Sequence, residues 1–327
     1  MRLWLAGNRL ALYVAAAAVM AAASYVRTPY SLMLPGHAVR LRDVVQVANH
    51  APPSTDYYLT DVRFAARATP LQLLSALIPG AQIVRTDQVL PQSVTAVEYD
   101  GIEREAMSES QSIAAFVAER EAGLRVPVPR TRVLAVYFAP FSPAKHVLRS
   151  MDMFISLNGH PIASNVDVRR ALERVRPGST VRVAIYRRGR ERIVAVPTIR
   201  YGVRTALGVY LTTIYQRPQI PIAVRYHLPG VEGSSGGLMF ALDIYRSLRP
   251  CTDCAYARVA GTGTIAYDGS VGPIEGAKQK VIAARNAGAA LFLVPRQNYA
   301  EIRATRGLRV VPVSTFREAL SALASPS

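Results

Sequence analysis

Ser235 is the residue of this 327-residue chain whose surroundings best suit nucleophilic chemistry. It lies in the run Gly233-Ser234-Ser235-Gly236-Gly237, between a strand predicted over residues 220–226 and a segment of helical spacing that begins at Leu238. Glycines let a substrate backbone come close, and the N–H groups of a first helical turn can stabilise an oxyanion. A Ser/Gly turn that only caps a helix is the alternative, and these five residues alone favour it.

A lysine further along the chain could activate this serine. The helix predicted over residues 275–287 contains Lys278 and Lys280, which point to different sides, so at most one can face the serine. Lys280 shares its side with small residues such as Ala277 and Ala284, which suit a packed interface. Burial would lower the pKa of Lys280, and a neutral amine can take the proton of a serine hydroxyl. The alternative is a surface lysine on an amphipathic helix, the usual position of a lysine.

The segments around these two residues resemble the Lon-type proteolytic domain. Residues 232–242 resemble its nucleophile region, and residues 261–265 together with 272–280 resemble its lysine region. The resemblance implies that Ser235 is the nucleophile and Lys280 the base of a Ser–Lys dyad. The comparison of helix faces selects the same lysine.

Three neighbouring residues are expected to support the dyad. The resemblance implies that the Thr262 hydroxyl helps to position the lysine. Backbone N–H groups from Gly233 to Gly236 are expected to hold the oxyanion. The sequence departs from the usual pattern of the family at Ser234, where proline is usual, and at Gly236, where alanine is usual. Neither departure removes a reacting group.

Residues 204–322, which contain these segments, alternate predicted strands and helices and form the expected Lon-type α/β domain. The only two cysteines of the chain, Cys251 and Cys254, lie here, and in an exported domain such a C-x-x-C pair is expected to form a local disulfide. A zinc site would need further ligands, and no histidine lies nearby, so we expect neither a metal nor a cofactor. The clearest later elements are two strands and a closing helix: residues 290–294, 309–313 and 315–324.

The middle of the chain predicts several strands around one helix, at residues 165–174. Its cues are Ser142-Pro143-Ala144, Asp152 before a strand, the turn Asn158-Gly159, and Arg188-Gly189 after a strand. This order resembles a circularly permuted PDZ domain, although Met151 stands where a glycine usually precedes the aspartate. Such domains bind an extended peptide as an added strand. With a leading helix at residues 108–121, we expect the PDZ-like domain to span residues 107–200; a β-rich domain without a ligand is the alternative.

The N-terminal residues predict a membrane segment. Residues 10–26 form an apolar, alanine-rich run that follows Arg2 and Arg9. This order predicts that the N-terminus stays in the cytoplasm while the bulk of the chain is extracytoplasmic. We prefer a single-pass anchor over residues 1–26 to a cleaved signal peptide. Residues 27–106 predict a mixed α/β region beside the membrane, in which we find no chemistry.

Charge and motifs limit the partners. The net charge of +17 suits an anionic membrane surface or an acidic polymer. No aromatic ladder or nucleic-acid motif accompanies the basic residues, so no specific nucleic acid is expected. The five histidines are scattered without metal-ligand spacing, and no G-x-x-x-x-G-K-[ST] loop for nucleotide phosphates is present in the sequence.

Together these patterns predict an α+β multidomain protein with an N-terminal membrane helix, a PDZ-like β-rich domain and a C-terminal Lon-type proteolytic α/β domain. The combination resembles the PDZ-containing, Lon-like serine peptidases of bacterial cell envelopes. The resemblance implies an ATP-independent endopeptidase that acts outside the cytoplasmic membrane on unfolded or flexible polypeptides, with a PDZ-like domain for substrate or regulatory peptides and a homo-oligomeric ring. One alternative is a membrane-anchored PDZ adaptor with an inactive Lon-like domain, and another is an envelope-surface binder of acidic polymers.

Overall fold

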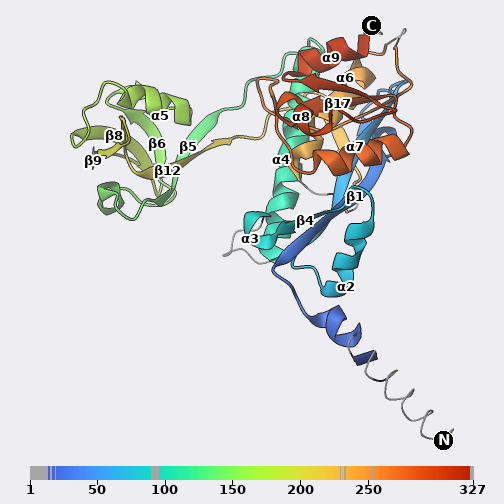
Figure 1. Cartoon of the computed structure of the whole chain (residues 1–327). Coiled ribbons are helices and arrows are strands. Elements are labelled where there is room, and N and C mark those ends of the chain that lie inside the picture. Colours follow the sequence, from blue (N-terminus) through green and yellow to red (C-terminus); the bar gives the residue numbers. More distant parts are fainter. Residues whose placement is uncertain are drawn as a thin grey trace, which may run out of the picture. The chain divides into compact units, whose positions relative to one another are not determined.

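The computed structural model describes residues 14, 17–18, 20–89, 96–228, 230–231, 233–251 and 254–324. The chain divides into two compact units (Figure 1). Unit 1 consists of Met1–Val126 and Ile220–Ser327, and unit 2, Pro127–Gln219, is inserted between these two parts. The chain therefore leaves unit 1 once and returns to it shortly before the loop that carries Ser235.

Unit 1 is built on a six-stranded sheet with the strand order β18-β17-β14-β3-β1-β4. The pairs β18–β17, β17–β14 and β14–β3 are parallel, whereas β1 pairs antiparallel with both β3 and β4. The sheet is therefore mixed, with its parallel part formed mainly by the C-terminal strands. The strands are β1 (Tyr30–Arg40), β3 (Asp56–Ala65), β4 (Gln82–Arg85), β14 (Arg258–Gly261), β17 (Leu291–Pro295) and β18 (Arg309–Val313).

Helices cover both faces of this sheet, and the side chains of each strand alternate between the two faces. In β17, Leu291 and Leu293 join the core formed with α4, α6 and α9, whereas Phe292 and Val294 join the core formed with α7 and α8. Because β17 is buried on both faces, its sequence is hydrophobic throughout. The helices are α4 (Ala96–Glu121), α6 (Gly237–Leu248), α7 (Ala277–Asn286), α8 (Tyr299–Ile302) and α9 (Phe316–Ala324).

Short elements connect the main ones in unit 1. The helical segment that starts after Thr69 is α2 followed by η2, and Thr69 forms a capping box with Gln72 at its start. Two small antiparallel pairs, β2–β13 and β15–β16, lie outside the large sheet. The short elements are η1 (Leu41–Asp43), β2 (Val45–Val47), α2 (Pro70–Leu73), η2 (Leu74–Leu77), α3 (Thr86–Val89), β13 (Val224–Tyr226), η4 (Ser234–Gly236), β15 (Thr264–Ile265), β16 (Val271–Gly272) and η5 (Arg296–Asn298).

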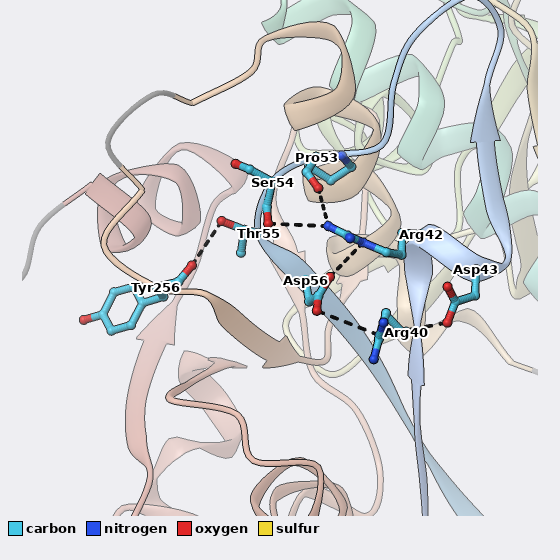
Figure 2. A network of polar contacts seen from close by, with 8 residues as sticks. All are labelled: Arg40, Arg42, Asp43, Pro53, Ser54, Thr55, Asp56 and Tyr256. Carbon is cyan, nitrogen blue, oxygen red and sulfur yellow. Dashed lines mark hydrogen bonds and ion pairs between the residues drawn. The ribbon is translucent and has the colours of Figure 1, made fainter.

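Residues 27–106 belong to unit 1, which differs from the separate membrane-proximal region predicted from the sequence. Three of the six strands of the large sheet, β1, β3 and β4, come from this segment. Figure 2 shows a polar contact that fastens it to the C-terminal part of unit 1: Thr55 donates a hydrogen bond to Tyr256 O at 3.0 Å. Within the segment, Arg42 forms an ion pair with Asp56 at 2.7 Å. Local patterns do not show this arrangement, because β3 pairs with a strand about 200 residues further along the chain.

Unit 2 is a β-rich domain around one helix. Its sheet has the order β12-β5-β6-β8-β9 with β7 paired to β6, and all of these pairs are antiparallel. A capping box between Ser164 and Asp167 starts α5, which buries Val168 and Leu172 in the core of the unit. The elements are β5 (Thr131–Phe138), η3 (Pro143–His146), β6 (Met153–Leu157), β7 (His160–Pro161), α5 (Asn165–Leu172), β8 (Thr180–Arg187), β9 (Arg190–Pro197), β10 (Ile199–Tyr201), β11 (Arg204–Ala206) and β12 (Val209–Tyr215).

The turn before β6 explains why glycine is usual at the position of Met151. Met151 has a φ of +69°, a conformation that glycine adopts without strain. The next residue, Asp152, is buried and pairs with Arg187 at 2.5 Å, and it also accepts a hydrogen bond from the Arg149 N–H. The turn is therefore held by a buried ion pair although its first position carries a side chain.

The helix that the sequence assigns to the start of the PDZ-like domain belongs to unit 1 instead. This helix is the C-terminal half of α4, which begins at Ala96. Its Phe116 and Val117 pack in the same core as α6. An apolar stripe shows that a helix is packed but not which neighbour it packs against, so the sequence could not place it.

Two further predictions concern the strand before Ser235 and the N-terminal segment. The strand predicted over residues 220–226 is shorter in the structure, where β13 begins at Val224. Part of the predicted membrane segment, residues 10–13, 15–16 and 19, lies outside the described residues. Within the described part of the chain, no helix is long and apolar enough to cross a membrane.

Candidate active site

A cleft of about 880 Å³ in unit 1 contains both Ser235 and Lys280. One wall is formed by β3, a second by α4, and a third by the segment that leads into α7. Ser235 lies in η4, immediately before α6, where the sequence predicts a loop-to-helix junction. The cleft is thus built from segments at both ends of unit 1 and is open to a substrate.

The structure brings the serine and the predicted lysine into contact. Lys280 Nζ lies 2.7 Å from Ser235 Oγ, within hydrogen-bond distance. Lys280 is only 5% exposed, and on its own helix Ala277 and Ala284 are fully buried beside it. Lys278, two positions earlier, is exposed. The small alanines let α7 pack closely on the sheet, which places the longer lysine side chain in the cleft.

Thr262 lies against both members of this pair. Its Oγ1 is 3.4 Å from Lys280 Nζ and donates a hydrogen bond to Ser235 O at 3.1 Å. The threonine is fully buried and directly follows β14. One hydroxyl can therefore hold the amine and the serine backbone at a fixed separation.

The surroundings of Lys280 favour its neutral form. Burial lowers the pKa of Lys280 from 10.5 to about 8, and the negative charges of Asp61, Glu275 and Glu103 act in the opposite direction. All three carboxylates line the cleft. A substantial fraction of the amine is therefore neutral slightly above neutral pH, as a general base requires.

Two contacts fix the backbone on either side of Ser235. Ser110 Oγ, on α4, donates a hydrogen bond to Ser234 O at 3.0 Å, and the Gly263 N–H donates to Ser235 O at 2.7 Å. Because a peptide group is planar, holding Ser234 O also fixes the direction of the Ser235 N–H. That N–H lies in the first turn of a helical segment, where it can donate to an oxyanion.

Gly233 and Gly236, next to Ser235, are glycines for two different physical reasons. Gly233 has a φ of +89° and donates its N–H to Glu103 O at 3.1 Å. A Cβ at Gly236 would lie 2.7 Å from Leu59 Cδ1, so the alanine that is usual at this position in the resembled family does not fit here without a shift of Leu59. The departure at Gly236 therefore matches its local packing.

Several residues in or next to the cleft were not predicted as site residues. Asp61 falls in the region of residues 27–106, in which the sequence shows no chemistry, and Glu103 precedes the predicted start of its helix. Ser110 lies in a predicted helix without any chemical motif. No local signal marks these residues, because they approach Ser235 only through long-range packing. Outside the cleft, Cys251 and Cys254 form a disulfide.

Comparison with known proteins gives two family matches. Residues 114–198 match the PDZ domain, and residues 210–324 match the Lon protease (S16) C-terminal proteolytic domain. A solved PDZ domain of an SdrC-like protein from Listeria monocytogenes aligns with 27% of this chain and 93% of its own, at 17% identity and a TM-score of 0.23.

Curated relatives match at modest identity. A Lon protease of Azospirillum brasilense is 34% identical over 122 residues, which are 36% of this chain and 15% of the relative. A Lon protease of Lachnoclostridium phytofermentans is 31% identical over 111 residues, 32% of this chain and 14% of the relative. This chain therefore spans about a seventh of the length of these relatives.

These matches define the class of protein: the chain combines a PDZ domain with a Lon-type C-terminal proteolytic domain. The proteolytic domain and the Lon protease relatives together support a serine peptidase.

Proposed function

We propose that this protein is a serine endopeptidase in which Ser235 is the nucleophile and Lys280 the general base. The observation that carries this proposal is the 2.7 Å contact between Ser235 Oγ and the buried Lys280 amine, inside a cleft large enough for a peptide. A surface lysine on an amphipathic helix would show neither the burial nor the contact.

The reaction follows from this geometry. Neutral Lys280 takes the proton of Ser235 as Oγ attacks the carbonyl carbon of the scissile peptide bond. The Ser235 N–H, and with it the backbone between Gly233 and Gly236, stabilises the negative oxygen of the tetrahedral intermediate. The resulting ammonium of Lys280 protonates the leaving amine, and the C–N bond breaks to give an acyl-enzyme. Water, activated by the again neutral Lys280, then releases the acid product.

Thr262 has a positioning role in this proposal. Its hydroxyl contacts Lys280 Nζ and Ser235 O, so it limits the rotation of the lysine and keeps the two reacting atoms in line. Loss of this hydroxyl should lower the rate of acylation without removing either reacting group.

The substrates in this proposal are unfolded or flexible polypeptides, and the PDZ domain binds substrate or regulatory peptides. We include cleavage without ATP, since the sequence contains no phosphate-binding G-x-x-x-x-G-K-[ST] loop. The apolar run at residues 10–26 after two arginines supports a location of the enzyme on the outer side of the cytoplasmic membrane. A homo-oligomer, as the resemblance to Lon implies, completes the proposal.

The alternative function is a peptide-binding adaptor whose proteolytic domain is inactive. The intact contact between Ser235 and Lys280 favours the enzyme, because a domain released from catalysis has no reason to keep an amine buried at a cost in stability.

The test is cleavage of an unstructured protein by the full chain without nucleotide. We expect cleavage by the parent protein, none by Ser235→Ala or Lys280→Ala, and parent-like cleavage by Lys278→Ala, the matched lysine on the exposed side of α7. A serine-reactive fluorophosphonate should label the parent but not Ser235→Ala. Equal cleavage by all variants would refute the dyad, and a folded parent that neither cleaves nor is labelled would favour the adaptor.

A further inference from the structure

Unit 2 carries most of the net positive charge of the protein. Residues 127–219 contain sixteen Lys and Arg against four Asp and Glu, which gives +12 of the total +17. Among the acidic residues, Asp152 is already paired with Arg187 in the interior. A unit of this size with such an excess attracts polyanions or anionic surfaces. The question is which of these its surface fits.

The hairpin β10–β11 presents apolar side chains at its tip. Tyr201 pairs with Arg204 across a two-residue turn, Gly202 and Val203, in which Gly202 has a φ of +58°. Val203 is 95% exposed and Tyr201 70% exposed. Transfer of such an exposed aliphatic side chain from water into an apolar phase lowers its free energy. Unit 2 itself provides no apolar neighbours that bury the Val203 side chain.

The base of this hairpin is fixed beside further arginines. Thr205 Oγ1 donates a hydrogen bond to Val175 O at 2.5 Å, and Thr198 Oγ1 donates to Ser179 O at 2.7 Å. These bonds hold the hairpin against the turn at residues 174–179. Four exposed arginines thus lie on the hairpin and on this turn: Arg174, Arg176, Arg200 and Arg204.

We propose that this surface, the hairpin tip with its four arginines, docks on an anionic lipid bilayer. Val203 and Tyr201 enter the boundary between headgroups and acyl chains, and the arginines bind lipid phosphates. A nucleic acid or an acidic polysaccharide could pair with the arginines but offers no apolar phase for Val203. A bilayer with anionic lipids accommodates both parts of the surface, because it provides phosphates for the arginines and an apolar phase for Val203. Tyrosine and arginine are side chains that generally suit the membrane interface.

A reporter placed on the tip tests the proposal in the full chain. The only tryptophan of the sequence, Trp4, is replaced by phenylalanine, and Val203→Trp introduces a fluorophore at the tip. With phosphatidylcholine vesicles that also contain phosphatidylglycerol, we expect a blue shift of the indole emission and quenching by nitroxide-labelled lipids. With phosphatidylcholine alone we expect neither. Because the fluorophore is on the hairpin, lipid contact by another part of the chain does not produce this signal.

Matched variants separate the proposal from its alternatives. Ala304→Trp in the same background reports from unit 1, where Ala304 is exposed after α8, and should remain unquenched. Arg200→Gln with Arg204→Gln should weaken the lipid-dependent signal by about fivefold per arginine removed, whereas Arg182→Gln on β8 should change it less.

Two results would overturn the proposal. The first is an indole at position 203 that is quenched no more than the one at position 304 in phosphatidylglycerol vesicles. The second is a DNA duplex or an acidic polysaccharide that binds the protein equally before and after Val203→Asp and excludes it from the vesicles. The readout needs no peptidase activity, so it stands or falls separately from the proposed reaction.

Discussion

Peptidase activity should rise with pH around a midpoint near 8, because only the neutral form of Lys280 can accept the Ser235 proton. The pKa of Lys280 is lowered by burial from 10.5 to about 8. At pH 7 roughly 10% of such a lysine is neutral, against roughly 0.03% of a lysine with an ordinary pKa, a difference of about 300-fold in active enzyme. Between pH 7 and pH 8 the neutral fraction, and with it kcat/KM, should rise about fivefold.

Glu275→Gln tests the electrostatic part of this reasoning. The Glu275 carboxylate raises the pKa of Lys280, so its removal should move the midpoint to lower pH and leave the plateau at high pH unchanged. Glu275 is exposed and directly precedes the N-cap residue of α7, so the substitution should not disturb the fold. Lys278→Gln is the control: it changes a nearby charge on the exposed side of the same helix and should leave the midpoint in place.

The assay is the rate of acylation by a fluorogenic peptide from about pH 6 to about pH 10, with folding followed by circular dichroism at each pH. A midpoint near 6.5 would instead indicate a histidine base and would refute the role of Lys280. A midpoint that Glu275→Gln raises would show that the carboxylate does not stabilise the charged form of the lysine, contrary to the expected attraction between opposite charges.

Three further predictions concern stability, measured by urea denaturation. Lys280→Met should stabilise the fold by up to about 3 kcal/mol at pH 7, because the pKa of Lys280 is lower in the folded than in the unfolded state. The gain should fade as the pH rises from about 8 to 10.5, and a gain that persists at higher pH would contradict this reasoning. Asp243 is 2% exposed, and burial raises its pKa from 3.8 to about 7. The parent should therefore lose stability as the pH rises between these two values. Asp243→Asn should be more stable than the parent by about 4 kcal/mol above pH 7 but not near pH 4. Met151→Gly should stabilise unit 2 by about 1 kcal/mol by relieving a positive φ, whereas a loss would show that the Met151 side chain is needed.

The elements around the site could be predicted because their signals are local. The glycines around Ser235 mark a junction between loop and helix, and the valine-rich run at residues 309–313 forms β18 at the residues predicted for it. On α7, the spacing of alanines and lysines is sufficient to show that Lys280 and not Lys278 is buried. Each of these features depends on a few neighbouring residues.

The remaining features depend on contacts between distant residues. The parallel pairing of β3 with β14 joins residues about 200 positions apart, and nothing within β3 itself shows that Asp61 lies beside a nucleophile. In the same way, the apolar stripe of α4 fits a helix of either unit. Parallel neighbours in a sheet are not joined by a short turn, and both faces of each strand are buried. The local sequence of a strand therefore does not show which other strand it pairs with.

The insertion of unit 2 at a point shortly before Ser235 in the sequence has a physical explanation in the contacts of unit 1. Near the point where the chain leaves, Arg249 at the end of α6 donates two hydrogen bonds to Ala122 O, at 2.7 and 3.0 Å. Near the point where it returns, the Ile222 N–H donates to the buried Glu119 carboxylate at 3.1 Å. The exit is therefore fixed to the end of α6 and the return to α4, and α4 also holds the nucleophile loop through Ser110. Since a domain can be inserted wherever entry and exit are held by the host, these bonds let unit 1 carry the extra domain while its own contacts keep Ser235 in place.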